Sequence, residues 1–317
     1  MSNKKIIAVM GATGAQGGGL VRAIAANPES GFVARAITRD VTSEKAKALS
    51  ALGVEVVAAN IDDVESLKKA FAGAHGVFGV TFFWDHFDPV KETGQAKNMA
   101  DAAKAAGVKH FVWSSLEDTR NFLSLESTSM PTLHGKYKVP HFDSKGEVDP
   151  YFAQIGLPTT ILWTSFYWEN LIYFGMGPQK IPDGSLALVI PMGDKKLPGI
   201  AAEDIGKCAF GIFKKGDELI GKTVAVAGEH LTGKQMADGL SAATGKQIAH
   251  VSVPFDVYRG FGFPGAEDVG NMFQFKYDFQ EQFVGVRDLD FARKLNPELK
   301  SYSAWLKENA SKVPFPE

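Results

Sequence analysis

The residues with the clearest chemical potential lie near the amino terminus, in the run GATGAQG at residues 11–17. This run follows the apolar segment 6–10 and precedes a helical pattern that begins at Leu20. A strand, a glycine turn and a helix in this order build a phosphate-binding site, because glycine lets backbone N–H groups approach a diphosphate. Position and order therefore favour a dinucleotide site over an ordinary strand–helix turn, although the spacing is one residue longer than the common G-x-G-x-x-G.

A second charged position follows the next expected strand, 32–38, where Arg39 and Asp40 come directly after Thr38. An acidic residue here typically holds the ribose hydroxyls of NAD, whereas arginine can bind the 2′-phosphate of NADP through two charge-assisted hydrogen bonds. We favour NADP(H), with Arg39 on the phosphate and Thr38 and Ser43 as further hydroxyl donors. Because Asp40 is acidic, NAD remains an alternative cofactor. Arg39 can alternatively be a solvated surface residue without a ligand.

Two more groups of candidates follow the third and fourth expected strands, 54–58 and 76–81. The first group reaches the sheet edge where an adenine would lie, and Asp62 can accept a hydrogen bond from its amine. The second group contains an aromatic pair that would cover the cofactor or the substrate cleft, unless it packs in the core. The residues are Asn60, Ile61 and Asp62 in the first group and Thr81, Phe82 and Phe83 in the second.

These positions require a particular arrangement of strands and helices. Strands expected at 6–10, 32–38, 54–58, 76–81, 110–114 and 159–162 alternate with helices expected at 20–27, 43–52, 64–71, 91–106 and 142–155. Such alternation builds right-handed crossovers, so we predict an α/β fold with a Rossmann-like, doubly wound parallel sheet. We expect residues 1–165 to form this core, completed by segments near 200–216 and 246–258.

The remainder of 166–317 is expected to form a smaller C-terminal α/β lobe over the cleft. Its pattern predicts an edge or hairpin strand at 185–190, helices at 202–213 and 232–243, and strands at 223–227 and 247–253. Glycine and proline are frequent between residues 175 and 199, and residues 255–283 are rich in aromatic side chains.

Composition excludes several classes of function. The 317 residues carry a formal net charge of −2 at pH 7, which gives no reason to expect direct binding to nucleic acid or to an anionic membrane. The one cysteine, Cys208, permits no intramolecular disulfide, and we expect it to be a buried thiol. The seven histidines show no metal-ligand spacing, so no metal is expected. We expect a cytoplasmic protein, also nuclear if the source is eukaryotic, and a monomer or homodimer.

The motifs together resemble the NmrA-like family, an atypical branch of the short-chain dehydrogenases/reductases, and most resemble its NADPH-sensor members. The resemblance is carried by residues 11–17, by Thr38-Arg39, by HFDSKGE at 141–147 and by YWEN at 167–170, and it covers nearly the whole chain. It implies a Rossmann core that binds NADP(H). The residues that it assigns to the cofactor are Gly11, Thr13, Gly14, Ala15, Gln16, Gly17, Arg39, Asn60, Ile61, Thr81, Phe82, Phe83, Lys145, Tyr167, Trp168, Glu169 and Asn170.

The position of the usual proton donor departs from the superfamily pattern. Typical members carry Tyr-x-x-x-Lys on one helix, where the lysine lowers the pKa of the tyrosine and binds the nicotinamide ribose. None of the seven tyrosines here is followed by a lysine four residues later, and the matching place has His141 and Lys145. Ser114 or Ser115, at the end of the fifth strand, can still orient a carbonyl group.

Two classes of function follow. In the first, which the missing tyrosine favours, the protein senses NADP(H) without turnover and signals to a protein partner such as a transcription regulator. In the second, it reduces a quinone or an aromatic carbonyl compound, with Lys145 or His141 as proton donor. A small aromatic substrate would then lie among aromatic residues of the cleft. The loop 121–140 is longer than expected for vertebrate sensors, and the sequence assigns it no contacts.

Overall fold

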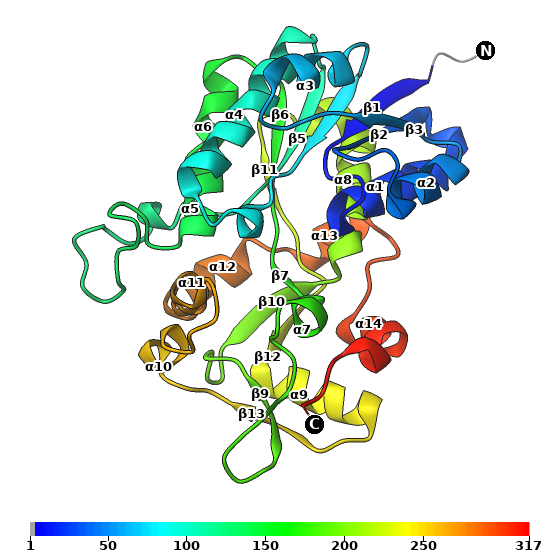
Figure 1. Cartoon of the computed structure of the whole chain (residues 1–317). Coiled ribbons are helices and arrows are strands. Elements are labelled where there is room, and N and C mark those ends of the chain that lie inside the picture. The colour runs from blue at the N-terminus through cyan, green and yellow to red at the C-terminus, as the bar shows by residue number, and fades with distance from the viewer. Residues whose placement is uncertain (1–3, 317) are drawn as a thin grey trace.

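Seven parallel strands form the centre of the molecule, in the order β11-β6-β5-β4-β1-β2-β3 (Figure 1). The computed structural model describes residues 4–316. In chain order the strands are β1 (Lys5–Val9), β2 (Phe32–Thr38), β3 (Glu55–Ala58), β4 (Gly76–Gly79), β5 (His110–Ser115), β6 (Thr159–Trp163) and β11 (Thr223–Ala225). The order reverses between β1 and β4, which confirms the predicted doubly wound sheet and leaves a crevice at the carboxyl ends of these two strands.

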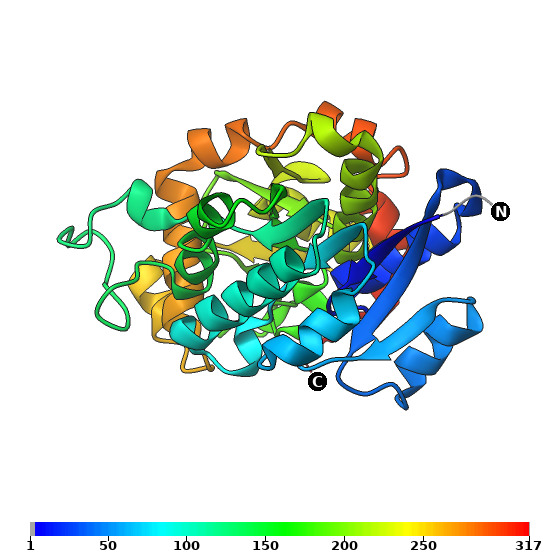
Figure 2. The ribbon, with the colours of Figure 1, turned by 90° about the horizontal axis from the view of Figure 1, so that it is seen from above.

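Helices cover both faces of this sheet (Figure 2). One face buries an apolar cluster with α1 (Ala15–Ala25), α2 (Glu44–Ala51), α8 (Ala202–Lys215) and α13 (Leu289–Leu295). The other buries a cluster with α3 (Val64–Phe71), α4 (Pro89–Ala105) and α6 (Asp149–Gln154). Cys208 lies on α8 inside the first cluster, where it is fully buried, and burial raises the pKa of its thiol.

Close packing of α1 on α8 depends on glycine. A Cβ atom at Gly19 would meet the carbonyl oxygen of Glu203, and one at Gly206 would meet the carbonyl oxygen of Gln16. The two helices can approach this closely only without side chains at these positions. This packing fixes the position of α1 and therefore of its amino-terminal end, which directly follows the glycine turn.

Capping side chains explain why the helices begin where they do. Ser43 accepts a hydrogen bond from the N–H of Ala46 at the start of α2, and Asp63 caps α3 in the same way. The helix predicted at 142–155 is wrong as one element, because the structure has two: α5 (Pro140–Gly146) and α6. Pro150 has no N–H group and its ring clashes with a preceding turn, so a new helix must start there.

The lobe contains two small sheets, β12-β10-β7 and β13-β9-β8, and an apolar core of its own. Its strands are β7 (Phe166–Tyr167), β8 (Gln179–Lys180), β9 (Leu186–Val189), β10 (Lys196–Ile200), β12 (Glu229–Thr232) and β13 (Ile248–Val251). Its helices are α7 (Asn170–Tyr173), α9 (Gly233–Thr244), α10 (Phe255–Arg259), α11 (Ala266–Asp278), α12 (Gln280–Gly285) and α14 (Tyr302–Asn309).

The segments after residue 165 divide between the central sheet and the lobe differently from the prediction. The segment 200–216 joins the central part of the molecule as α8, and β11 pairs with β6 in the central sheet. The segment 246–258 does not join it, because β13 pairs with β9. The hairpin alternative predicted for 185–190 is confirmed by the antiparallel pairing of β9 with β8, whereas the edge alternative is wrong, because β9 is the middle strand of its sheet. The physical reason is that a short apolar strand such as β13 carries no local signal of which sheet it joins, so its pairing partner in the lobe decides its place. A division of the chain at residues 165 and 166 stays a prediction.

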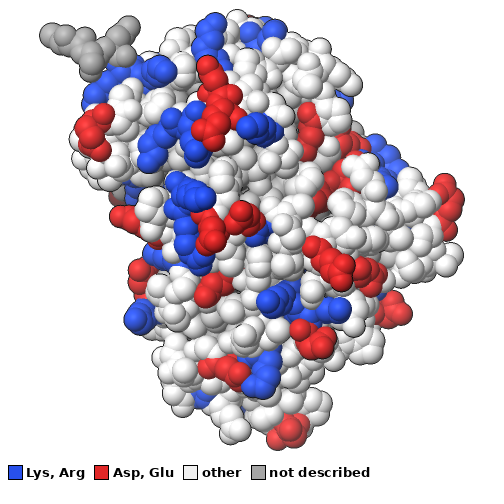
Figure 3. Space-filling view, turned by 180° about the vertical axis from the view of Figure 1, so that it is seen from behind, with Lys and Arg blue, Asp and Glu red and all other residues white. Residues whose placement is uncertain are grey.

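Charges of both signs are interspersed on the face opposite that of Figure 1 (Figure 3).

Within residues 4–316, no helix combines the length and the apolar character needed to cross a membrane.

Candidate functional site

A cavity of about 670 Å³ lies at the carboxyl ends of the central strands and extends beneath the lobe. Its wall includes the glycine turn at one end and residues of α5, β7 and α11 at the other. This is the switch point of the sheet, where open α/β folds bind their ligands. The predicted residues that line it are Gly11, Thr13, Gly14, Ala15, Gln16, Gly17, Thr38, Arg39, Asn60, Ile61, Asp62, Thr81, Phe82, Phe83, Ser114, Ser115, His141, Lys145, Tyr167, Glu169 and Asn170.

The glycine turn has the shape of an anion cradle. Gly11 takes a φ of +59°, which favours glycine, and a Cβ atom at Gly17 would meet the carbonyl oxygens of Gly11 and Met10. Gly14 is the N-cap of α1, and no side chain caps the helix or places an acidic group in its first turn. The first N–H groups of α1 thus remain available, and they favour a negative charge at this end of the helix.

Arg39 and Asp40 point to different surroundings. Arg39 lines the cavity at its exposed mouth, where Nη1 lies 3.3 Å from Oδ2 of Asp85. The carboxylate of Asp40 does not line the cavity and accepts hydrogen bonds from N and Oγ1 of Thr42, which lowers its pKa. Ser43 also lies outside the cavity wall, because its hydroxyl caps α2; its predicted contact with the cofactor is therefore not supported by the geometry.

Residues on α4 hold the segment that follows β3. Asn98 Nδ2 donates to the carbonyl oxygen of Ile61 at 3.1 Å, and Gln95 Nε2 donates to Oδ1 of Asp62 at 2.9 Å. Asn60 accepts the N–H of Asp62 through its side chain. These hydrogen bonds order this part of the wall without a ligand. One carboxylate oxygen of Asp62 already accepts a hydrogen bond.

Lys145 projects from α5 into a buried polar network. Its Nζ lies 2.6 Å from Oε1 of Glu92 and 2.5 Å from Oγ1 of Thr81, which in turn donates to Glu92 at 2.6 Å. Glu92 is fully buried in the first turn of α4, and its second oxygen lies 3.3 Å from Nε2 of His86. The carboxylate therefore fixes the ammonium group at the cavity wall. Sequence reasoning missed Glu92, because nothing in the pattern of α4 separates it from a surface acid.

His141 is held by a second carboxylate that the sequence analysis missed. Its Nδ1 lies 2.6 Å from Oδ1 of Asp268, and its backbone N–H donates to Oδ2 of the same residue at 3.1 Å. Its ring packs 4.7 Å from the ring of Trp84, between centroids. Among residues 4–316, Nε2 has no hydrogen-bond partner, and His141 lines the cavity. The residues of the pair are 127 positions apart, so only the fold brings them together.

A chain of hydroxyl and amide groups crosses the cavity floor. Ser114 Oγ donates to Oε1 of Gln16 at 2.8 Å, and Gln16 Nε2 donates to the hydroxyl oxygen of Tyr167 at 2.7 Å. Burial raises the pKa of Tyr167 to about 12, so its phenol stays protonated near neutral pH. Ser115 donates instead to Oδ1 of Asp149, whose pKa burial raises to about 7.

The predicted stretch 167–170 divides between the cavity and the core. Trp168 is fully buried in the lobe, with its ring 5.3 Å from that of Tyr302, and it does not line the cavity. Its side chain lies on the opposite side of the segment from Tyr167, so the predicted cofactor contact of Trp168 is not supported by the geometry. Glu169 lines the cavity, but its two oxygens accept from Nε1 of Trp305 and from the N–H of Ala202.

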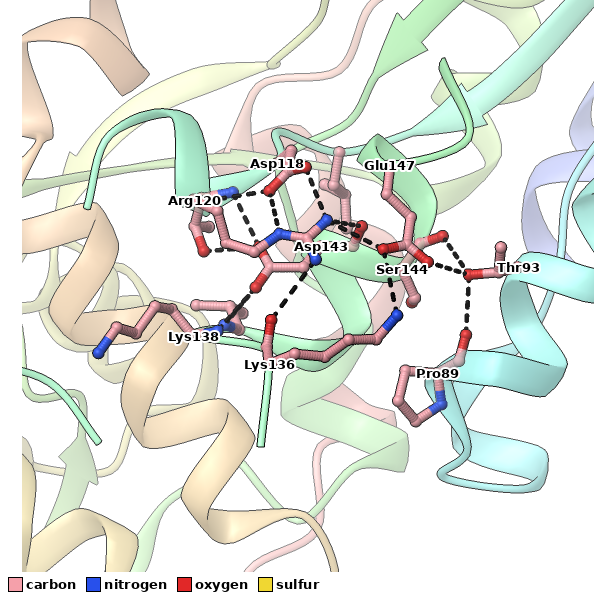
Figure 4. A network of polar contacts seen from close by, with 12 residues as sticks. Pro89, Thr93, Asp118, Arg120, Lys136, Lys138, Asp143, Ser144 and Glu147 are labelled. Atoms are coloured by element: carbon pink, nitrogen blue, oxygen red, sulfur yellow. Dashed lines mark hydrogen bonds and ion pairs between the residues drawn. The ribbon is translucent and has the colours of Figure 1, made fainter. Parts of the chain in front are cut away.

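The loop 121–140 is tied to the helix that carries His141 and Lys145 (Figure 4). Nη2 of Arg120, directly before the loop, lies 2.7 Å from Oδ2 of Asp118 and 3.1 Å from Oε2 of Glu147. At its end, the buried carboxylate of Asp143 accepts the backbone N–H groups of Lys138 and Val139. These contacts anchor both ends of the loop to α5.

Comparison with known proteins places the chain among relatives with the same architecture. The NmrA-like family model matches residues 3–306. The NmrA-like family domain-containing oxidoreductase FrzB of Cladobotryum sp is 33% identical over 242 residues, which cover 69% of this chain and 67% of that protein. The corresponding oxidoreductase cpsB of Aspergillus campestris is 30% identical, with 98% of this chain and 91% of that protein covered.

A solved structure shares nearly the whole fold. The negative transcriptional regulator Nmra, in complex with NADP, has 26% identity and a TM-score of 0.77, with 97% of this chain and 96% of that chain covered. The same regulator in complex with NAD has 27% identity and a TM-score of 0.78 over 97% and 96% of the two chains. The family model, the curated relatives and this likeness agree with the resemblance of the motifs. The chain belongs to the NmrA-like family.

Proposed function

We propose that the protein binds NADP(H) in the cavity and acts as an oxidoreductase that reduces an aromatic carbonyl compound or a quinone. The single observation that carries this proposal is the His141–Asp268 pair, in which His141 lines the cavity in the position of the superfamily's proton donor and Asp268 holds its ring. Curated relatives bear the name oxidoreductase, and the structural neighbour Nmra binds both NAD and NADP. These names support the proposal without identifying a substrate.

The residues present fit the cofactor. The N–H groups at the start of α1 would hold the diphosphate, because the glycines leave the backbone bare there. Arg39 would hold the 2′-phosphate, since it lines the cavity while Asp40 is bound to Thr42. Lys145 would hold the nicotinamide ribose, and Glu92 keeps it in place. The cofactor, when bound, supplies a hydride.

His141 would supply the proton that accompanies the hydride. Because Asp268 accepts from Nδ1, Nε2 is the ring nitrogen left to exchange a proton with a substrate oxygen. Tyr167 is a weaker candidate, since its pKa of about 12 disfavours release of its proton and its hydroxyl oxygen already accepts from Gln16. The rings of Phe83 and Trp84 beside His141 would exclude water from the reacting group.

The test is NADPH oxidation with a panel of quinones, aromatic aldehydes and aromatic ketones, under conditions where NADPH binding is measured in parallel. We expect turnover of at least one compound by the native protein. Asp268→Asn should lower the rate constant about 100-fold while it leaves NADPH affinity unchanged, because positioned acid–base groups contribute about this much. Equal rates for the native protein and this variant would remove the role of the pair.

A second candidate function is the redox sensor, in which NADP(H) occupancy alters contacts with a protein partner. One observation favours it: His141 replaces the tyrosine of the catalytic superfamily motif. The sensor account predicts NADPH binding with no oxidation by any compound of the panel. It also predicts a difference in hydrogen-exchange protection of the lobe between NADPH and NADP⁺, because a ligand shifts a conformation only through differential affinity. Turnover in the panel would decide against it.

A further inference from the structure

Lys276 on α11 is a buried amine that the chemistry above does not use. Its side chain lines the cavity, and only 2% of the residue surface is exposed. Its Nζ lies 5.3, 5.5 and 5.8 Å from the ring centroids of Phe283, Phe142 and Phe166. Within residues 4–316 it has neither a hydrogen-bond acceptor nor a carboxylate partner. Buried lysines are rare without such a partner.

The charged groups around Lys276 do not neutralise it. Glu117 is the nearest acidic influence, but both its oxygens bind Arg287, at 2.7 and 3.0 Å, in a buried bidentate pair. Arg287 is itself a neighbouring cation that disfavours a second positive charge. Burial, followed by the effect of Arg287, lowers the pKa of Lys276 to about 7. The amine is therefore only partly charged at neutral pH, although it faces a cavity that can hold an anion.

The other charged residues that the structure describes in the cavity wall are paired, apart from Lys91, which is exposed. Lys145 is paired with Glu92, and Arg39 is paired with Asp85 at the exposed mouth. Among the acids of the wall, Asp62 is bonded to Gln95 and Glu169 to Trp305. Lys276 is the buried cation of the described wall whose partner is missing, so a ligand group can complete it.

We propose that Lys276 binds the carboxylate or phenolate oxygen of an acidic aromatic substrate, whose ring packs among the phenylalanines that line this end of the cavity. The inference rests on the proposed function, since it names the substrate class of the same site. Phe142 and Phe166 supply flat apolar walls, and Met272 of α11 adds a thioether that adapts to ring edges. The anion would replace water at the amine and stabilise the ammonium form.

Proton linkage predicts how the binding of an anion at Lys276 should depend on pH. Above about pH 7 the free amine is mostly neutral, so binding an anion must draw in a proton; below pH 6 it is already charged and no proton is taken up. The apparent affinity for an aromatic carboxylate should therefore be constant below pH 6. It should fall about tenfold between pH 7 and pH 8.5, with an uptake of about one proton per ligand at the upper end.

The experiment uses 2-naphthoate and its neutral isostere 2-naphthamide as probes, titrated by calorimetry into the full chain saturated with NADP⁺. Titrations in buffers of different ionisation enthalpy report the proton uptake. We expect 2-naphthoate to bind at least tenfold more tightly than 2-naphthamide at pH 6, and to take up a proton at pH 8. Lys276→Met should abolish the preference and the uptake. Lys91→Met, at an exposed lysine of the cavity wall, is the matched control and should retain both.

The outcomes separate the two proposals. If NADP⁺ fails to bind, the proposed function is overturned. If NADP⁺ binds but the two probes bind equally, or neither binds, or proton uptake is absent at pH 8, the role of Lys276 is overturned while the proposed function stands. Because proton uptake is measured on the native protein, the test does not depend on the folding of Lys276→Met.

Discussion

The two ends of the cavity are built by different means. The nucleotide end is built mainly of backbone, namely a glycine turn, the first N–H groups of α1 and the ends of β2 and β3, with the side chain of Arg39 at its mouth. The aromatic end consists of side chains from α5, β7 and α11, which meet only because the lobe folds over the sheet. A backbone site is specified by local sequence, whereas a side-chain site is specified by the whole fold. Under the proposed function, the first end would bind the nucleotide that many proteins share, and the second would select the substrate.

The largest expected effect is at the nucleotide end. Gly17→Ala should lower NADPH affinity by more than about 100-fold, because the added Cβ would meet the carbonyl oxygens of Gly11 and Met10 and displace the turn. The measurement is NADPH fluorescence titration together with thermal unfolding. Gly94→Ala on α4 is the matched control: nothing lies near its Cβ, so it should leave binding unchanged and stabilise the helix by about 0.5–1 kcal/mol. Equal binding by both variants would contradict the cradle.

The next largest effect is expected at the aromatic end, and it should leave nucleotide affinity unchanged. His141→Asn keeps a hydrogen-bond donor for Asp268 but removes the nitrogen that exchanges a proton. We expect the rate constant for reduction to fall by about 100-fold, with NADPH affinity within about twofold of the native value. Parallel loss of binding and rate would show that the two ends are not separable.

A smaller effect should distinguish the two nucleotides. Arg39→Gln should weaken NADPH binding by about 10- to 30-fold and leave NADH binding nearly unchanged, since a charge-assisted contact at an exposed side chain contributes about 1.5–2 kcal/mol, the lower part of its range. Titration of both nucleotides into the native protein and the variant measures this. If the native protein binds them equally, Arg39 has no selective role, and the alternative of an NAD site regains support.

The smallest effect should come from Asp85. Its carboxylate lies 3.3 Å from Arg39 and would compete with a 2′-phosphate for the guanidinium group. Both side chains are exposed, so solvent screens the pair and the effect is small. Asp85→Asn should strengthen NADPH binding about threefold at low salt, and the gain should shrink as salt rises. Weaker binding by this variant would mean that Asp85 orients Arg39 instead of competing for it.

The same contrast explains how much the sequence could predict. The alternation of strands with helices and the glycine turn follow from local patterns, and the predicted fold class is confirmed. Asp268 and Glu92 could not be found, because each acts on a residue far away in the chain and looks like an ordinary helix acid. The motif assigns Trp168 to the cofactor, but its side chain points into the lobe core, on the opposite side of the segment from Tyr167.

The placement of the segments after residue 165 was hard to predict for a topological reason. The chain leaves the central sheet after β6, builds β7 to β10 of the lobe, and returns through α8 to β11. A short apolar strand such as β11 or β13 carries no local signal of which sheet it joins. Only pairing partners decide this, and they are set by packing across the whole chain.

The most direct test of the account is a crystal structure of the protein with NADP⁺. We expect the diphosphate against the N–H groups of Ala15 and Gln16 at the start of α1, the 2′-phosphate against Arg39, and the nicotinamide ring inside the cavity near Lys145 and His141. A nicotinamide ring held outside the cavity, or a nucleotide bound elsewhere on the surface, would contradict the account, because no hydride could then reach a substrate beside the His141–Asp268 pair.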